Sequence, residues 1–299
     1  MTRTDAAPRP EAAECGTICA VAGRAQRDMR EWAEAYPGLF SAKPFDAALY
    51  STLSLAMAFS GPWFTAEQLR MANKVCLWAF GLDWLVDYVA TSPEEVEGVV
   101  RRCLEVADGA APEDGDDLTL MLAGIRDELA ASPAHPVLGP FWRAELGRML
   151  EAMLREARWK ADKVTPGFDD YLGNADNLGF CFAFAAHWLY TAGSAESPAE
   201  GLGEILDEVA EASRSVQRVI RLINDLGTYE RDVVWGDLNA LLLGPERAEV
   251  ERRVVELAAR SRELIAPLRD RAPELAGYLE RQMDFCAGFY QVTDYWGAL

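Results

Sequence analysis

The stretch "EASRSVQRVIRLINDLGTYERDVV", residues 211–234, carries two patterns of helical period side by side. Its apolar residues recur at spacings of three and four, which is typical of the buried side of an α-helix: Val216, Val219, Ile223 and Leu226. Its polar residues gather on an adjoining strip, about 80° wide between Asn224 and Asp232 at 100° per residue: Gln217, Arg221, Asn224, Thr228, Arg231 and Asp232. Because a solvated helix face would favour Lys and Glu, this strip predicts a helix that holds a ligand.

The composition of the strip suggests what the ligand is. Asn224, Thr228 and Asp232 place an amide, a hydroxyl and a carboxylate one helical turn apart, and these are the hard oxygen ligands that suit magnesium. Arg221 and Arg231 flank them, and guanidinium groups bind phosphate well. The strip therefore predicts a site for magnesium and a phosphate-bearing ligand.

The same helical period runs through most of the chain. With 299 residues, 50% of them hydrophobic, the protein can bury a large core. Pro and Gly clusters separate roughly ten predicted helices. We expect an all-α fold with a flexible tail at residues 1–20, where both charges mix with proline, and a single helical domain at 21–299.

Charge and cysteine usage exclude several classes of protein. The net charge is −19, which opposes non-specific binding to nucleic acid or to an anionic membrane. Six scattered cysteines and two histidines give little support for a zinc cluster or a disulfide framework. The N-terminus lacks the apolar run of a signal peptide, and the longest apolar stretch, from Leu178, is too short to span a bilayer. These features predict a cytoplasmic protein without membrane insertion.

A second polar feature lies in "CLWAFGLDWLVDYVA", residues 76–90. Asp83 and Asp87 are four residues apart and share one face of a predicted helix. Most acidic pairs on helices are solvated, but the remaining residues of this face are apolar. Burying two unpaired carboxylates is costly, so the pair implies a bound cation, a shared proton or an open cavity. If the two helices face each other, the combined site fits a magnesium-held diphosphate.

On these residues the chain resembles the class I terpene synthases. That family carries a DDxxD segment and a downstream NDxxSxxxE triad. The triad matches as "NDLGTYERD", residues 224–232, with Thr228 for Ser and Asp232 for Glu, and "DWLVD" keeps Asp83 and Asp87 with Trp84 between them. The resemblance extends from about residue 25 to the end and implies a single bundle of the isoprenoid synthase fold.

Finer features resemble the bacterial labdane-related diterpene synthases. Many family members place a diphosphate-sensing arginine just before a helix break, where "DYLGNADNLG" (170–179) has Ala175 behind Asn174. The "GDLNALLL" segment (236–243) is similar to the same branch. Asp294 stands before Tyr295, where many bacterial sesquiterpene cyclases have an arginine. The resemblance thus leaves Arg221 and Arg231 to hold the diphosphate.

The resemblance also implies a mechanism. Magnesium ions, three in number and with manganese as a substitute, would draw diphosphate from a C20 allylic substrate, a bicyclic copalyl-type diphosphate being favoured over linear geranylgeranyl diphosphate. The metal ligands would be Asp83, Asp87, Asn224, Thr228 and Asp232. The carbocation would be enclosed by aromatic faces and by carbonyls of the helix break: Phe80, Phe182, Asn174, Ala175, Leu178 and Gly179. The family also allows a homodimer.

Three alternatives stay open. The chain could be a sesquiterpene cyclase acting on farnesyl diphosphate, or a condensing enzyme of the squalene or phytoene synthase type, which uses DxxxD but needs a second copy of it. It could also be a helical scaffold with an acidic surface. The "DGDD" of residues 114–117 matches a class II cyclase pattern, but its polar surroundings predict a loop and a helix N-cap.

Overall fold

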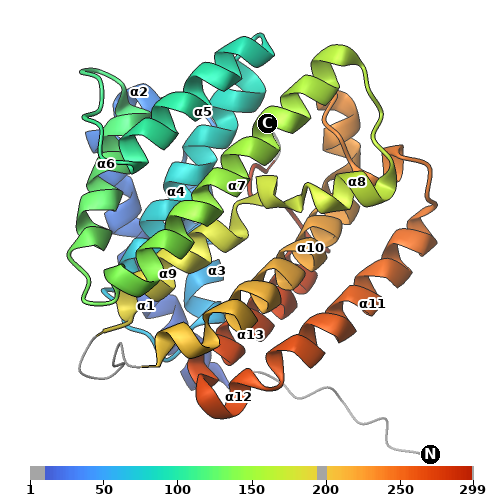
Figure 1. The fold of residues 1–299 in the computed structure, drawn as a ribbon. Coiled ribbons are helices and arrows are strands. Elements are labelled where there is room, and N and C mark those ends of the chain that lie inside the picture. Colours follow the sequence, from blue (N-terminus) through green and yellow to red (C-terminus); the bar gives the residue numbers. More distant parts are fainter. Residues whose placement is uncertain (1–10, 194–200, 298–299) are drawn as a thin grey trace, which may run out of the picture.

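The computed structural model describes residues 11–193 and 201–297, and every regular element within these residues is helical (Figure 1). The all-α prediction is therefore confirmed. The α-helices are α1 (Ala12–Ala35), α2 (Pro37–Phe40), α3 (Ala47–Ser60), α4 (Arg70–Trp84), α5 (Pro93–Ala107), α6 (Asp117–Ala130), α7 (His135–Asp162), α8 (Phe168–Gly173), α9 (Phe180–Thr191), α10 (Leu202–Trp235), α11 (Arg247–Ile265), α12 (Leu268–Arg271) and α13 (Pro273–Phe289). A π-helical turn, η1 (Leu85–Val89), and two 3₁₀ turns, η2 (Ala175–Leu178) and η3 (Ala240–Leu242), complete the set.

The N-terminal boundary differs from the prediction. Helix α1 begins at Ala12, so the flexible tail expected at 1–20 is wrong for residues 12–20, and residues 1–10 lie outside the described part. The physical reason is that buried Ile18, Ala22, Ala25 and Met29 recur at helical spacing and dock α1 on the bundle. The chain is also divided more finely than roughly ten helices, because α2, α8 and α12 are short turns of 4, 6 and 4 residues.

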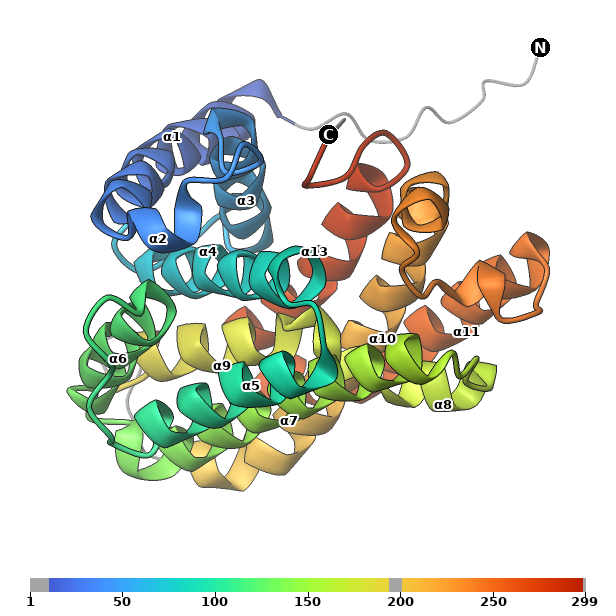
Figure 2. The same cartoon turned by 90° about the horizontal axis from the view of Figure 1, so that it is seen from above.

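The long helices pack side by side in neighbouring pairs. Helix α10 lies against α11 and α13, α7 lies against α5 and α9, and α3 packs against both α1 and α13 (Figures 1 and 2). The main hydrophobic cluster draws buried residues from α1 through α13. This arrangement brings the carboxyl-terminal ends of α4 and α10 toward each other, with α7 beside them.

The acidic loop before α6 has the role predicted for it. Asp116 is the N-cap, and its side chain accepts a hydrogen bond from the backbone N–H of Thr119 at 3.3 Å. Asp117 opens the helix and accepts from the N–H of Gly38 at 2.6 Å. The "DGDD" segment is thus a loop and helix start, as expected, because its carboxylates satisfy free backbone donors.

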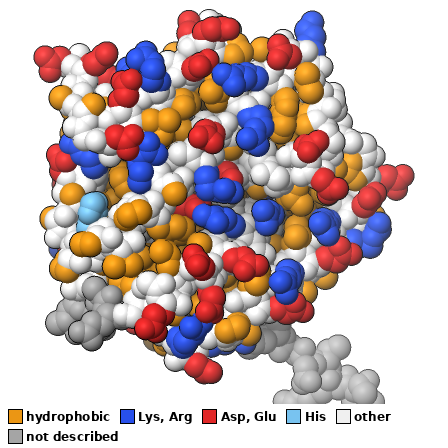
Figure 3. Space-filling view, in the orientation of Figure 1, with side chains coloured by type: hydrophobic (Ala, Val, Ile, Leu, Met, Phe, Trp, Pro, Cys, Tyr) orange, Lys and Arg blue, Asp and Glu red, His pale blue; other side chains and the backbone are white. Residues whose placement is uncertain are grey.

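The surface carries both signs of charge. On the face in Figure 3, Lys and Arg side chains alternate with Asp and Glu, and hydrophobic side chains show between them. Over the described part of this face, the net negative charge therefore does not form one continuous acidic patch. None of the helices in residues 11–193 and 201–297 has the length and apolar character needed to cross a membrane.

Candidate active site

The quoted stretch lies in α10, the longest helix, and both of its patterns are buried. Val216, Val219 and Ile223 belong to the core, as predicted. Most of the polar strip is also enclosed: Thr228 is 1% and Asp232 4% exposed, while Asn224 and Arg231 are partly buried. Because burying polar groups is costly unless they are satisfied, this strip is built for internal contacts or a ligand rather than for solvent.

The helix with the aspartate pair is not α-helical throughout. Helix α4 ends at Trp84 and continues as the π turn η1, closed by a hydrogen bond from the N–H of Ala90 to the carbonyl of Leu85 at 2.8 Å. The continuous α-helix predicted over 76–90 is therefore wrong at its end. The wider turn carries Asp87, and both Asp83 and Asp87 still line one pocket. π turns often mark functional positions in helices.

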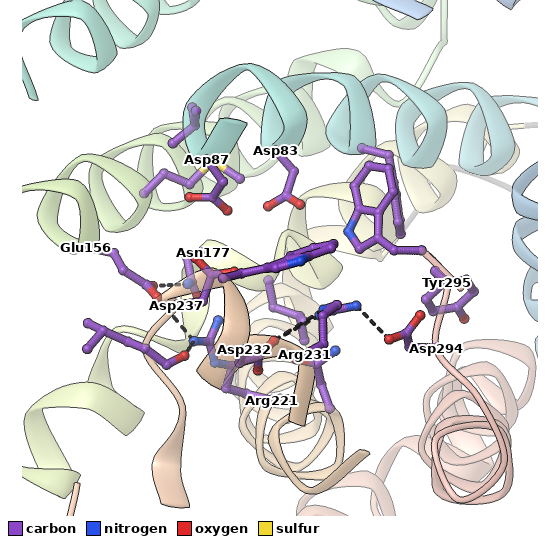
Figure 4. Close-up of a pocket in the computed structure, with 18 of the residues that line it drawn as sticks. Asp83, Asp87, Glu156, Asn177, Arg221, Arg231, Asp232, Asp237, Asp294 and Tyr295 are labelled. Atoms are coloured by element: carbon purple, nitrogen blue, oxygen red, sulfur yellow. Dashed lines mark hydrogen bonds and ion pairs between the residues drawn. The ribbon is translucent and has the colours of Figure 1, made fainter. Parts of the chain in front are cut away.

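One pocket joins the two motifs. In Figure 4, Asp83 and Asp87 point down from α4 and η1 toward Arg231 and Asp232 on α10. The predicted site residues that line it are Phe80, Asp83, Asp87, Leu178, Arg221, Asn224, Arg231 and Asp232. The prediction that the two polar features face each other is confirmed by this shared lining.

Several residues expected at the cavity do not line it. Asn174 and Ala175 are each 2% exposed, and the Asn174 amide donates to the carbonyl of Ala152 at 3.0 Å. Gly179 sits at the helix break with φ 73°, the left-handed region that favours glycine, which supports the predicted break. In the described structure these three residues belong to the support behind the pocket wall.

The placement of Phe182 is a further correction. Its ring is buried in the core, with centroids 5.6 Å from Trp78 of α4 and 6.0 Å from Trp142 of α7. Helix α9 is apolar on all sides, so its sequence does not indicate which aromatic ring turns toward the cavity. Phe80, by contrast, lines the pocket, and its ring centroid lies 5.6 Å from that of Tyr295 and 5.1 Å from that of Trp296.

Asp232 is held by several donors. Its Oδ2 accepts from the Thr228 hydroxyl at 2.6 Å and from the Asn239 amide at 2.8 Å. Its Oδ1 accepts from the Arg231 guanidinium at 3.1 Å. Thr228 is not among the pocket-lining residues and lies behind Asp232, so its assignment as a metal ligand stays a prediction.

Arg231 lies in the middle of the pocket wall. It forms ion pairs with Asp232 at 3.1 Å and with Asp294 at 2.7 Å, and its guanidinium lies 4.9 Å from the Trp235 ring centroid (Figure 4). Burial alone would lower the pKa of Arg231, but Asp294 and Asp232 hold it above its ordinary value. Asp294, noted in the sequence only for replacing an arginine, therefore pairs the C-terminal segment, residues 290–297, with α10.

The guanidinium of Arg221 has more protein partners than the sequence suggested. Its Nε donates to the Tyr171 hydroxyl at 2.8 Å, and it forms ion pairs with Asp225 and Glu156 at 3.4 Å each. Its side chain is only 10% exposed. Arg221 reaches the pocket wall, but these groups already use most of its donors.

The aspartate pair carries unfavourable charge. Burial raises the pKa of Asp83 well above its ordinary value, and the carboxylates of Asp87 and Asp237 raise it further. Burial also raises the pKa of Asp87 to about 7, against the opposing effect of Lys160, whose ammonium lies 3.7 Å away. A divalent cation would offset the cost of burying these negative charges. The carboxylate and amide oxygens of the pocket are the donor set that Mg²⁺ and Mn²⁺ prefer.

Other charged residues in or next to the pocket lie outside the two predicted motifs. Glu156 reaches the pocket from α7 and bonds the amide of Asn177, while Lys160 of α7 pairs with Asp237 at 2.6 Å. Asp237 could have been suspected, since it follows Gly236 directly after α10. The α7 residues could not, because a charged residue on an amphipathic helix is ordinarily solvated.

Comparisons with known proteins agree with this geometry. Residues 74–243, more than half of the chain, match the family described as "Terpene synthase family 2, C-terminal metal binding". The chain is 27% identical over 289 residues to ent-pimara-9(11),15-diene synthase of Streptomyces sp. (strain KO-3988), covering 93% of each chain.

Solved structures of low identity share the fold. The 2-methylisoborneol synthase of Streptomyces coelicolor A3(2), in complex with Mg²⁺ and geranyl-S-thiolodiphosphate, is 16% identical with a TM-score of 0.70, over 98% of this chain and 95% of that one. The linalool/nerolidol synthase of Streptomyces clavuligerus, in complex with 2-fluorogeranyl diphosphate, is 18% identical with a TM-score of 0.69, over 91% and 97%.

The helical bundle and its carboxylate-lined pocket are those of a class I terpene synthase. The chain belongs to terpene synthase family 2 and is a lyase that acts on prenyl diphosphates. The resemblance inferred from the two motifs is thereby confirmed.

Proposed function

We propose that this protein is a class I diterpene synthase that ionises a C20 allylic diphosphate with the help of Mg²⁺ and cyclises the resulting carbocation. The observation that carries the proposal is that Asp83 and Asp87 share one pocket with Asn224, Arg231 and Asp232, although the two groups are far apart in the sequence. The diterpene synthase relative supports the C20 class.

The proposed metal ligands are Asp83 and Asp87 on one side and Asn224, Thr228 and Asp232 on the other. When bound, Mg²⁺ would stabilise the negative charge that develops on the departing diphosphate. The two carboxylates of α4 and η1, destabilised by burial when unliganded, favour cation binding. Ion number and the use of Mn²⁺ belong to the same proposal.

Arg231 is the proposed diphosphate-binding arginine. Its guanidinium lies at the pocket between two carboxylates, and a diphosphate could replace Asp294 as its partner. Arg221 is better suited to fix the pocket wall, since Tyr171, Asp225 and Glu156 already bind it.

The apolar part of the pocket would enclose the carbocation. Tyr88, Trp235, Tyr295 and Trp296 join Phe80 in its wall, and their ring faces can stabilise positive charge without reacting. Excluding water from this region would prevent premature capture of the cation.

The substrate must displace part of the wall. The pocket holds about 160 Å³ of free space, less than the roughly 300 Å³ at which sites for drug-sized ligands begin. The C-terminal segment contributes Tyr290 and residues 294–296 to the wall, and it would be released if diphosphate replaced Asp294 as the partner of Arg231. Among C20 substrates we favour a bicyclic copalyl-type diphosphate over geranylgeranyl diphosphate, on the resemblance of Asn174-Ala175 and of residues 236–243.

Turnover of defined diphosphates tests the proposal. Purified protein is incubated with Mg²⁺ and, separately, copalyl, geranylgeranyl, farnesyl and geranyl diphosphate, and released diphosphate and hydrocarbon products are measured. Hydrocarbon from a C20 substrate, lost with EDTA and in Asp83→Ala and Asn224→Ala, is the expected result. Turnover confined to farnesyl diphosphate would replace the diterpene assignment with a sesquiterpene one. Wild-type turnover in both variants would refute the metal-site assignment.

A further inference from the structure

Asn239 is a fully buried residue outside α10, and its side-chain amide contacts that helix. It is 0% exposed and lies just before η3, in the segment that follows α10. Its Nδ2 donates to Asp232 Oδ2 at 2.8 Å and to the carbonyl of Asp225 at 2.8 Å. Its Oδ1 accepts from the N–H of Leu241 at 3.0 Å.

These three bonds fix the orientation of the amide. Both Nδ2 protons are used on oxygen acceptors, and the oxygen faces a backbone donor. Rotating the amide by 180° would place its oxygen against two other oxygens and its NH₂ against the N–H of Leu241, so only one orientation is compatible with the surroundings. Asn239 therefore presents a donor to Asp232 at a fixed position.

The segment that carries Asn239 is anchored twice on α10. Gly236, with φ 73°, ends the helix and reverses the chain, and the N–H of Asp237 bonds the carbonyl of Asp232 at 2.9 Å. Two turns earlier in α10, the Asp225 carboxylate accepts from the N–H of Ala240 at 3.2 Å. Asn239 lies between these anchors, which makes it a rigid support rather than a mobile loop residue.

We propose that Asn239 is a positioning residue that holds Asp232 for metal binding. The inference rests on the proposed function of Asp232 as a metal ligand. With Oδ2 occupied by Asn239 and by Thr228, the carboxylate turns Oδ1 toward Arg231 and the pocket. Asn239 does not line the pocket, so it acts on the site through Asp232.

The short side chain of Asp232 gives this support its importance. A Glu could adjust its carboxylate with one more rotatable bond, whereas an Asp on a rigid helix reaches only what its χ1 rotamer allows. A hydrogen bond that selects one carboxylate orientation lowers the entropy lost when a metal binds. Residues that orient metal ligands in this way typically account for ~10–100-fold in metal affinity.

The experiment measures metal binding without turnover. Mn²⁺ is titrated into the full-length protein with inorganic pyrophosphate present, and free Mn²⁺ is followed by its EPR signal. Asn239→Ser removes the amide NH₂ that bonds Asp232 and Asp225, while the hydroxyl of the shorter side chain can still accept from the N–H of Leu241. Asn239→Thr is the second variant, because residue 239 is extended (φ −144°, ψ 141°) and a β-branched residue suits that backbone. Affinity is expressed per mole of folded protein, so partial loss of folding does not obscure the result.

Two reference variants separate the possible outcomes. Asp232→Ala should remove the site, and Asn73→Ser makes the same chemical change at another amide that is 0% exposed and donates to the carbonyl of Leu69. We expect both Asn239 variants to bind Mn²⁺ ~10–100-fold more weakly and Asn73→Ser to bind within a factor of about two of wild type. Wild-type affinity in the Asn239 variants, or an equal loss in Asn73→Ser, would overturn the role of Asn239 alone. Absence of pyrophosphate-dependent Mn²⁺ binding in the wild type would overturn the proposed function as well.

Discussion

Asp87→Asn should stabilise the metal-free protein and reduce the thermal stabilisation that it gains from added Mg²⁺ and pyrophosphate. Burial raises the pKa of Asp87 from 3.8 to about 7. A carboxyl group whose pKa is raised in the folded state costs stability as the pH rises from 4 through 7, and the cost is constant above that. At 1.36 kcal/mol per pKa unit the full cost is ~4 kcal/mol. Because 32% of the side chain is exposed, solvent screening reduces this to about 2 kcal/mol.

The assay is thermal unfolding in EDTA at pH 8, monitored by circular dichroism. We expect Asp87→Asn to unfold ~4–8 °C above wild type, since each kcal/mol shifts the melting temperature of a large domain by ~2–4 °C and the expected gain is about 2 kcal/mol. The difference should shrink toward zero at pH 4. Lys160 keeps a partner in the variant, because Asp237 lies 2.6 Å from it. With Mg²⁺ and pyrophosphate added, wild type should gain more than the variant.

Asp108 on the surface provides a control for which the same substitution should change stability in the opposite direction. Hydrogen bonds from Arg143 lower the pKa of Asp108, so Asp108→Asn should lose stability at pH 8 rather than gain it. A lower melting temperature for Asp87→Asn in EDTA would refute the reasoning, because it would make Asp87 a structural partner of Lys160 rather than a carboxylate kept for a cation.

Two further predictions concern the supporting structure. Burial lowers the pKa of His187 from 6.5 to about 4, so the folded protein should lose ~3 kcal/mol as the pH falls between those values. Urea unfolding of His187→Phe should lack that slope, and parallel pH curves for the two proteins would contradict it. A Cβ at Gly227 would lie 2.6 Å from the carbonyl oxygen of Tyr290, so Gly227→Ala should cost ~1–3 kcal/mol or displace the C-terminal segment. Gly23→Ala, with nothing within 4 Å of the added Cβ, should instead stabilise by up to ~1 kcal/mol, and equal effects of the two changes would count against a clash.

The sequence predicted site residues only where their side chains recur at helical spacing. The strip from Asn224 to Asp232 and the pair Asp83 and Asp87 stand at spacings that any helix places on one face, so local geometry was enough. Even there the π turn at Leu85 was missed, since a π turn depends on the packing of its surroundings.

Helical period and short motifs were enough to predict the helical class, the polar strip of α10 and the family, because both are local properties of the chain. The residues that complete the pocket depend instead on contacts between distant parts of the chain. Glu156 comes from α7 and Asp294 from the C-terminal segment, while Phe182 turns into the core. Lys160 of α7 pairs with the lining residues Asp87 and Asp237. Such contacts depend on how whole helices rotate and pack against one another, and no spacing within one helix encodes that rotation. Asn239 is the clearest case. The chain reverses after α10, and this reversal brings the Asn239 amide within hydrogen-bonding distance of Asp225 and Asp232 on that helix.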